Sequence, residues 1–474
     1  MTETLVSRVD AFKNGLEPSK NVLENSNTRS TKTLKQKMKK IKTQQVLKQM
    51  LEQRIHAAGA FKHTDFTQQE YRHEVNKNTN IQRDIQTIQK EYNTLFSNQT
   101  QFAQQIAHEY ANNKQLIVSL AIALTQCGKT GTMLALIFHM IQLNKIKLEN
   151  VFIITGYSSK LWIQQTKERM PTIIHDHIFH RNTLHKFVKR ATGKQNILII
   201  TDETHIAIGH NQAIQKAFKQ LNLFNIQHMY QNDIKIVNFT ATPDNIANDL
   251  YTWKQAAKTF IMKPPNNYTS IFDLNHQNRI MQAKDLCGYD RQGNITNTEV
   301  TQNIKHILQF IGDKPKYHII RTHNGILHHR TILNFKQAIQ NDFEFISETQ
   351  CTDFTEMVKQ EPNKHTFIFI KEKLRCSKTL CKDHIGVLYE RAVKKTNMAS
   401  IIQGLAGRLT GYHNNKNSIV FTDIKQIVQY KHLWDNQFVL NHTQNNQNNT
   451  QNKTHSKHKT HSKHKTHNIF KLQQ

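Results

Sequence analysis

The sequence predicts an α/β protein built from two tandem parallel-sheet domains, and three observations lead to this fold class. Between residues 115 and 265, short β-rich apolar runs alternate with longer helical stretches. A second set of such runs follows between 317 and 422. Continuous apolar runs are typical of strands that are buried on both faces of a parallel sheet, and their alternation with helices is typical of doubly wound domains. Both ends of the chain, in contrast, are polar and basic.

The composition limits the class of protein. The chain has 474 residues, which suggests two or three domains, and 64 Lys and Arg against 35 Asp and Glu give it a formal net charge of +29. Its five cysteines show no paired metal-binding spacing, which excludes a small disulfide scaffold. The longest apolar run, 116–124, is too short to span a bilayer. Such an excess of positive charge favours a polyanionic partner, and nucleic acid is the first candidate.

The N-terminal region, 1–98, is expected to be basic and mostly helical. Residues 29–54 hold nine Lys or Arg and one acid, Glu52, with apolar residues at helical spacing. This helix would either pack its apolar stripe on the core or make an accessory contact with nucleic acid, and the sequence leaves both open. The first thirty residues lack an apolar signal core, so neither secretion nor organelle import is indicated.

The first α/β domain is expected over 99–264. Its apolar runs predict strands at 116–122, 151–156, 197–201, 234–240 and 259–262. Apolar spacing predicts helices at 129–143 and 212–224. A connector is expected at 265–300, since this stretch begins at Pro265 and contains the turn-like sequence 290–293.

The second α/β domain is expected over 301–435. Strands are predicted at 317–322, 343–347, 366–370, 384–389 and 418–422, with helices at 325–340 and 397–407. The remaining residues, 436–474, are expected to be disordered, because the tail is rich in Lys and His and repeats THSKHK at 454–459 and 460–465. Its His residues could hold a metal ion, but we expect the tail to add affinity for phosphate groups.

A phosphate-binding loop is expected after the first strand. The sequence 123–130, ALTQCGKT, fits the template GxxxxGK[ST] with alanine at the first glycine position. Backbone N–H groups of Gln126, Cys127 and Gly128 would wrap phosphate oxygens at the start of the next helix. Lys129 would reach the outer phosphates, and Thr130 would be a ligand of Mg²⁺.

An acidic pair follows a later buried strand. The run 197–201 leads into Asp202 and Glu203, and burying two adjacent acids is costly without a cation. Asp202 would hold Mg²⁺, and Glu203 would polarise an attacking water. The next strand ends in the sequence FTATP, whose hydroxyls of Thr240 and Thr242 could link the acidic site to another surface.

These segments together resemble the superfamily-2 helicases and related nucleic-acid-dependent ATPases of the DExH group. ALTQCGKT is similar to motif I, ITDETH to motif II, FTATP to motif III, 153–165 to motif Ia and 401–412 to motif VI. The strand 366–370 and the sequence after it stand at the place of motif V. The resemblance covers about 100–425, and the order of the motifs is that of the family. It implies two tandem RecA-like domains with ATP and Mg²⁺ as cofactors.

The resemblance also implies roles for individual residues. Lys129 would bind phosphate, and Glu203 would be the catalytic base. His205, Thr240 and Thr242 would couple hydrolysis to nucleic-acid binding. Further nucleotide-site residues implied by the family are Arg408, as an arginine finger from the second domain, Gln403 beside it, and Gln104 or Gln105 as the adenine-reading glutamine.

The motifs depart from the family in three places. Gln126 stands where the family usually has glycine. In motif VI, Gln403 is one residue further from Gly407 and Arg408 than usual, and Gly411 stands where a second arginine is expected. Motif V lacks its usual glycine and acid.

Three functions are therefore compared. The leading hypothesis is an ATP-dependent nucleic-acid motor that translocates along or unwinds DNA or RNA. The second is a translocase or remodelling ATPase that does not separate strands, and the third is a nucleic-acid-binding protein with a decayed ATPase core. No membrane association is expected. We expect an intracellular location, either cytoplasmic or nuclear. The Asn-, Lys- and Ile-rich composition suits an AT-rich genome such as that of a large virus.

Overall fold

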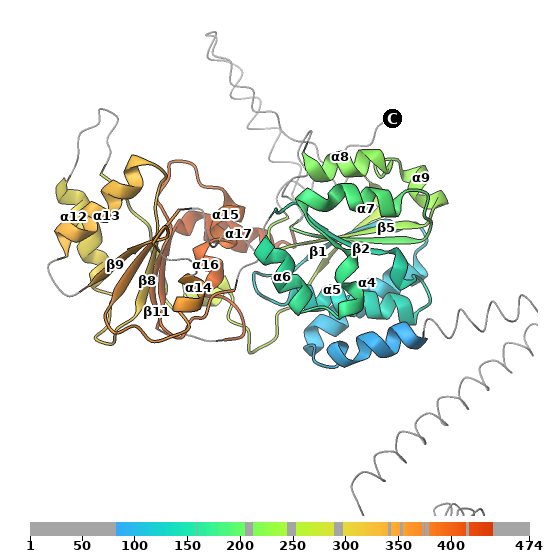
Figure 1. Cartoon of the computed structure of the whole chain (residues 1–474), viewed down its shortest axis with the longest axis horizontal. Coiled ribbons are helices and arrows are strands. Elements are labelled where there is room, and N and C mark those ends of the chain that lie inside the picture. The colour runs from blue at the N-terminus through green and yellow to red at the C-terminus, as the bar shows by residue number, and fades with distance from the viewer. Residues whose placement is uncertain are drawn as a thin grey trace, which may run out of the picture. The chain divides into compact units, whose positions relative to one another are not determined.

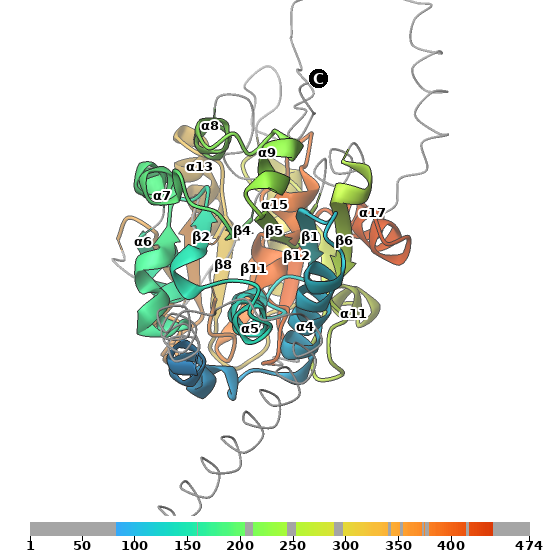
Figure 2. The same cartoon turned by 90° about the vertical axis from the view of Figure 1, so that its right-hand side faces the viewer.

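A computed structural model describes residues 82–438 except residue 159 and the segments 204–211, 244–252, 289–296, 340–342, 351–353, 372–373, 375–378 and 414–416. The predicted basic helix at 29–54, His205 and the tail from 439 lie outside the described residues. Figures 1 and 2 show two α/β domains, each with helices packed on both faces of a sheet. Within the described residues, no helix is both long and apolar enough to cross a membrane.

The first domain contains a six-stranded, all-parallel sheet with the order β3-β2-β4-β5-β1-β6. Its strands are β1 (Val118–Ile122), β2 (Val151–Thr155), β3 (Ile178–Phe179), β4 (Ile197–Asp202), β5 (Ile234–Thr240) and β6 (Ala257–Ile261). The predicted strands of this domain are all present. The sequence did not predict β3, because two residues give no readable pattern.

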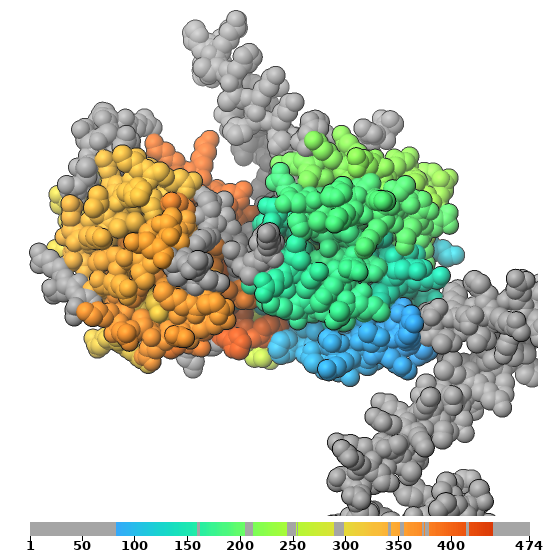
Figure 3. Space-filling view, viewed as in Figure 1, coloured from blue at the N-terminus to red at the C-terminus, as the bar shows by residue number. Residues whose placement is uncertain are grey.

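Helices connect and cover this sheet. They are α4 (Ser97–Asn112), α5 (Lys129–Gln142), α6 (Lys160–Glu168), α7 (Leu184–Ala191), α8 (Ala213–Gln220) and α9 (Ile226–Gln231). Apolar side chains from α4 and α5 pack against each other and against β1 in one core. Figure 3 shows α6 and α7, in green to teal, on the side of the first domain that is turned to the viewer. Residues 82–92 are also helical, and a break at 93–96 separates them from α4.

The second domain contains another six-stranded parallel sheet, in the order β7-β12-β11-β8-β10-β9. The strands are β7 (Ile280–Gln282), β8 (Tyr317–Arg321), β9 (Glu344–Ser347), β10 (Thr366–Ile370), β11 (Ile385–Tyr389) and β12 (Ile419–Thr422). The five predicted strands are present. The edge strand β7 lies inside the stretch 265–300 that the sequence assigned to a connector, because three residues next to turns do not show a strand pattern.

The helices of the second domain are α11 (Ile271–His276), α12 (Asn297–Leu308), α13 (Ile326–Ala338), α14 (Phe354–Met357), α15 (Met398–Ile402), α16 (Leu405–Arg408) and α17 (Ile424–Asp435). The helix predicted at 397–407 is therefore two short helices. The break lies at Gly404, where an added Cβ would be 2.3 Å from the carbonyl oxygen of Ser400. Only glycine fits this close approach of the backbone.

The register of the first sheet determines where its loops begin. Ile122 at the end of β1 pairs with Thr240 at the end of β5, and Asp202 at the end of β4 pairs with Phe239. Three segments therefore begin at the carboxyl ends of three adjacent strands: the phosphate loop, the acidic pair and the FTATP sequence. Carboxyl ends of parallel strands are the usual place for ligands in such sheets.

A buried histidine, His318, and the half-buried His365 support the start of the second sheet. The ring of His318 on β8 is fully buried; its Nδ1 accepts from the Val387 amide at 3.1 Å, and its Nε2 lies 3.1 Å from Nδ1 of His365. Gly386 makes room for this ring, since an added Cβ would lie 2.5 Å from its Cε1. Burial, together with the charges of His365 and Lys316, lowers the pKa of His318 to about 3.

Acid should therefore destabilise this domain. Below the ordinary histidine pKa of about 6.5, residue 318 binds a proton in the unfolded chain but stays neutral in the folded chain. The contribution of this residue to the unfolding free energy is therefore fully present above pH 6.5. It decreases by about 1.4 kcal/mol per pH unit as the pH falls below this value. We expect His318→Gln, which stays neutral, to flatten this slope between pH 6.5 and 5 in denaturant titrations. The same change at the exposed His432 is the control. Equal slopes for all three proteins would contradict the prediction.

Candidate nucleotide site

The phosphate loop connects β1 to α5 by a tight turn. Gly128, at the N-cap of α5, has φ 94°, and Gln126 has φ 63°. The left-handed conformation costs a residue with a side chain about 1–2 kcal/mol, which explains why glycine is usual at the position of Gln126. Here the glutamine adopts this conformation, so the turn forms without the family's glycine. Lys129 and Thr130 then occupy the first turn of α5.

The acidic pair lies at the carboxyl end of β4. Asp202 accepts a hydrogen bond at Oδ2 from the indole Nε1 of Trp162 at 2.9 Å. Its Oδ1 is buried and has no hydrogen-bond partner among the described residues. Burial raises the pKa of Asp202, and the neighbouring Glu203 raises it further, whereas Lys129 opposes both effects. A cation placed at Oδ1 would stabilise the ionised form of this buried carboxylate.

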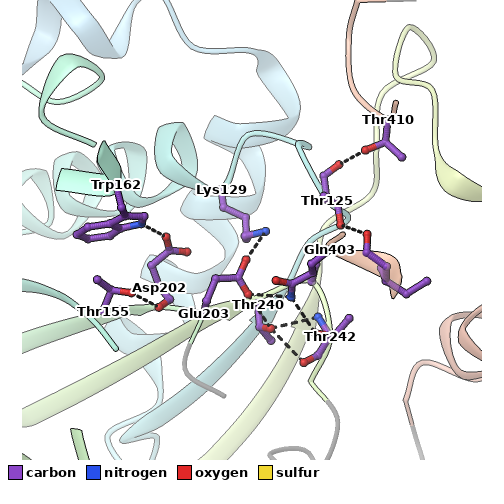
Figure 4. A network of polar contacts seen from close by, with 12 residues as sticks. Thr125, Lys129, Thr155, Trp162, Asp202, Glu203, Thr240, Thr242, Gln403 and Thr410 are labelled. Atoms are coloured by element: carbon purple, nitrogen blue, oxygen red, sulfur yellow. Dashed lines mark hydrogen bonds and ion pairs between the residues drawn. The ribbon is translucent and has the colours of Figure 1, made fainter. Parts of the chain in front are cut away.

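Glu203 is the centre of the site. Its side chain is 2% exposed, and its Oε1 lies 3.1 Å from Nζ of Lys129. The residue has φ 52°, which turns the chain sharply at the end of the strand. Thr240 Oγ1 lies 3.4 Å from Glu203 Oε2 and accepts from the amide of Thr242 at 3.1 Å. Figure 4 shows these four side chains converging on one point.

Residues of the second domain complete this network. The amide Nε2 of Gln403 donates to Oε2 of Glu203 at 2.9 Å and to Oγ1 of Thr242 at 2.8 Å (Figure 4). The break at Gly404 accommodates the extra residue between Gln403 and Arg408. Gln403 caps the end of α15, and Arg408 is the last residue of α16.

Arg408 is fully buried beside the same cleft. Its Nε donates to the carbonyl of Gly404 at 3.2 Å, and its Nη2 donates to the carbonyl of Gln403 at 2.9 Å. In this state the predicted arginine finger is therefore held by the backbone at the break between α15 and α16. It would have to exchange these bonds to contact a phosphate.

The phosphate loop is also held from outside its own domain. The carbonyl of Thr125 accepts from the hydroxyl of Tyr268 at 2.6 Å and from Thr410 Oγ1 at 2.8 Å. The hydroxyl of Thr125 donates to the carbonyl of Ile402 at 3.2 Å. The hydroxyl of Tyr412 donates to the carbonyl of Cys127 at 3.1 Å. The interdomain segment and the second domain both touch the loop that would bind phosphate.

These groups surround one cavity of about 480 Å³. Residues from both domains line it, namely Gln99, Thr125, Gln126, Gly128, Lys129, Thr130, Trp162, Arg169, Asp202, Glu203, Lys382, Gln403, Arg408, Gly411 and Tyr412 among others. The sequence-predicted residues Lys129, Thr130, Asp202, Glu203 and Gln403 are thus brought together. The unpartnered Oδ1 of Asp202 and the hydroxyl-bearing Thr130 in this lining fit a Mg²⁺ ion, which prefers oxygen ligands.

The predicted adenine-reading glutamines are elsewhere. Gln104 and Gln105 are exposed on α4, because Phe102, Ala103 and Ile106 form the buried face of that helix. The cavity contains Gln99 instead, 5% exposed, whose Nε2 donates to the carbonyl of Gly128 at 3.0 Å. Sequence spacing could not select Gln99 among the many glutamines of this region.

Other lining residues had no sequence signal of their own. The ring of Tyr412 stacks on Phe96 with centroids 4.5 Å apart, which places an aromatic pair at the cavity. The described residues contain no group of three or more His, Cys, Asp or Glu that could hold a further metal ion.

No protein-family model matches the chain. An uncharacterized protein of Acanthamoeba polyphaga mimivirus is 27% identical over 357 residues, covering 68% of this chain and 83% of the relative.

Solved structures similar to this chain are those of helicases. The Escherichia coli DEAH/RHA helicase HrpB matches with a TM-score of 0.40 and 14% identity over 69% of this chain and 43% of HrpB. The helicase MrfA bound to DNA and AMPPNP matches with a TM-score of 0.41 and 14% identity over 74% of this chain and 52% of MrfA. The chain spans about two fifths of the length of HrpB.

Removing the amide of Gln403 should weaken the closed arrangement. Gln403→Ala leaves a buried oxygen of Glu203 without this donor, and such a loss costs about 1–3 kcal/mol. We expect a lower unfolding free energy for the nucleotide-free protein, measured by denaturant titration. Gln337→Ala, at an exposed position on α13, is the matched control and should change stability by less than about 0.5 kcal/mol. A Gln403 variant as stable as this control would contradict the structure.

Proposed function

We propose that this protein is an ATP-dependent nucleic-acid motor of the helicase type. The observation that carries the proposal is the cavity in which the phosphate loop and acidic pair of one domain meet Gln403 and Arg408 of the other. A nucleotide in this cavity would contact both domains at once. Its binding and hydrolysis would therefore change the contact between them, which is what a motor requires.

The residues of the chain suggest how hydrolysis would proceed. Lys129 would leave its ion pair with Glu203 and bind the outer phosphates, while backbone N–H groups of the loop hold the phosphate chain. Thr130 and Asp202 would hold Mg²⁺, which neutralises charge on the phosphates. Glu203, freed from Lys129, would accept a proton from the attacking water.

The second domain would complete the site. Gln403 already contacts Glu203 and would help to orient the attacking water. Arg408 would exchange its carbonyl partners for the terminal phosphate and stabilise the charge that develops on it. Thr240 and Thr242 would relay the change at Glu203 to the nucleic-acid-binding surface, a role in which we also include His205.

The charge of the chain supports a nucleic-acid partner. A net charge of +29 at 474 residues favours contacts with a phosphate backbone, which are independent of base sequence and weaken as salt increases. The relative in mimivirus is compatible with a virus-encoded protein. The choice between DNA and RNA is left to experiment.

Steady-state ATP hydrolysis tests the proposal. The purified full-length chain is assayed alone and with single-stranded DNA, duplex DNA or RNA, beside Lys129→Ala. We expect one polymer to stimulate hydrolysis and Lys129→Ala to abolish it, because the variant lacks the cation of the phosphate loop. Lys147→Ala, exposed beyond the end of α5, is the control and should behave as wild type. Salt-sensitive polymer binding without any hydrolysis would favour a binding protein with a decayed ATPase core.

Glu203→Gln separates binding from chemistry. The variant keeps the size of the side chain, but it exchanges one accepting oxygen for an amide nitrogen that only donates, and it cannot accept the proton of water. We expect hydrolysis to fall about 10²–10⁴-fold while a fluorescent ATP analogue still binds. Unchanged hydrolysis would exclude Glu203 as the catalytic base. Strand displacement assays on the polymer that stimulates the wild type then distinguish unwinding from translocation alone.

A further inference from the structure

One face of α6 lines the nucleotide cavity. The lining residues are Trp162, Gln165, Thr166 and Arg169, the last directly after the helix end at Glu168. The offsets of three, four and seven residues place these side chains on one face of a helix. The helix therefore presents a continuous wall to the cavity from the side of the first domain.

Trp162 holds the carboxylate of Asp202 in one orientation. The indole is 6% exposed, and its N–H donates to Oδ2 at 2.9 Å. An indole N–H can only donate, so it cannot compete for a cation and matches a carboxylate oxygen well. With Oδ2 held, the buried Oδ1 is the oxygen left without a hydrogen-bond partner among the described residues. Figure 4 shows Trp162 and Lys129 on opposite sides of this carboxylate.

Arg169 differs from the other cations that line the cavity. Lys129 pairs with Glu203, Arg408 donates to the carbonyls of Gly404 and Gln403, and Lys382 donates to the carbonyl of His413 at 3.0 Å. In the part of the chain that the structure describes, the guanidinium of Arg169 makes no hydrogen bond or ion pair. Its charge nevertheless acts on Asp202, whose pKa it lowers slightly against the stronger effect of burial.

We propose that α6 is part of the nucleotide site, with Trp162 as a positioning residue that orients Asp202 toward a divalent cation and Arg169 as a ligand of the bound polyphosphate. The inference rests on the proposed function and deepens it. It gives the first domain a second positive charge for the phosphates beside Lys129, whereas Gly411 of the second domain provides none. The presence of the cation would also act directly on α6 through the Trp162–Asp202 hydrogen bond.

Metal binding tests the role of Trp162. Mn²⁺ binding to the full chain with ATP is followed by electron paramagnetic resonance for wild type, Trp162→Phe and Trp162→His. Loss of an outer partner of a metal ligand typically weakens binding 10–100-fold, so we expect at least a tenfold loss for the Phe variant. The His variant, whose ring can still donate, should recover part of the affinity. The control is Trp253→Phe, a buried tryptophan outside the cavity lining.

A split between kinetic constants separates positioning from a structural role. If Trp162 only orients a metal ligand, Trp162→Phe should require more Mg²⁺ for half-maximal hydrolysis but approach the wild-type kcat at saturating Mg²⁺. ATP binding measured without divalent cations should stay unchanged. Mn²⁺ affinity equal to that of the Trp253 control would overturn the role of Trp162, as would an equal loss of ATP binding without metal.

Nucleotide binding without metal tests Arg169. Binding of a fluorescent ATP analogue in the presence of a chelator is compared for wild type, Arg169→Gln and Arg169→Lys. One charge-assisted contact corresponds to about a tenfold or greater loss of affinity for the Gln variant, and the Lys variant should recover part of it. Lys167→Gln, on the same helix but outside the cavity lining, is the matched control. Equal affinities for Arg169→Gln and this control would overturn the assignment.

The two levels of the proposal fail in different ways. If the wild type hydrolyses ATP while both α6 variants match their controls, the α6 assignment is wrong and the motor proposal stands. If the wild type binds no nucleotide, both are wrong. Circular dichroism of each variant shows whether it has folded, and the His and Lys variants provide the measurement if the Phe or Gln variant has not.

Discussion

The parallel pairing of β4, β5 and β1 is the constraint on which the site depends. Because the three strands lie side by side in register, the chain must leave each of them at the same edge of the sheet. The phosphate loop, the acidic pair and the FTATP sequence come from separate parts of the chain. The pairing of their strands alone brings them close together. Helix and loop variation can then add groups around them, as α6 and α4 do with Trp162 and Gln99.

Glu203 connects the two domains electrostatically. Its buried carboxylate is shared between Lys129 of the phosphate loop and Gln403 of the second domain. A buried carboxylate needs such partners, since an unpaired charge away from water is costly. A nucleotide that draws Lys129 away would change these partners, and the contact between domains would respond. The carboxylate that we propose as the catalytic base is therefore also a point of contact between the domains.

Backbone carbonyls provide a second set of contacts between the domains. Hydroxyls of Tyr268 and Thr410 both donate to the carbonyl of Thr125, and the hydroxyl of Tyr430 on α17 donates to the carbonyl of Ala241 at 2.6 Å. Thr125 belongs to the phosphate loop and Ala241 to the FTATP sequence. Both loops of the first domain are therefore held by tyrosines from later parts of the chain, through bonds to backbone carbonyls that leave Lys129, Asp202 and Glu203 unused.

The sequence by itself determined the two α/β domains, ten of the twelve strands described and the group formed by Lys129, Thr130, Asp202, Glu203 and Gln403. These follow from local apolar patterns and from motifs that mark the ends of strands. Only the tertiary structure decided what lies around them. The very short strands β3 and β7 form because neighbouring strands offer them hydrogen bonds. The break at Gly404 brings Gln403 to Glu203 despite its spacing. Gln99 lines the cavity in place of Gln105, as do Trp162 on α6 and Arg169 directly after this helix. Helix packing selects which side of each helix is turned toward the cavity, and that choice has no signature in a single sequence.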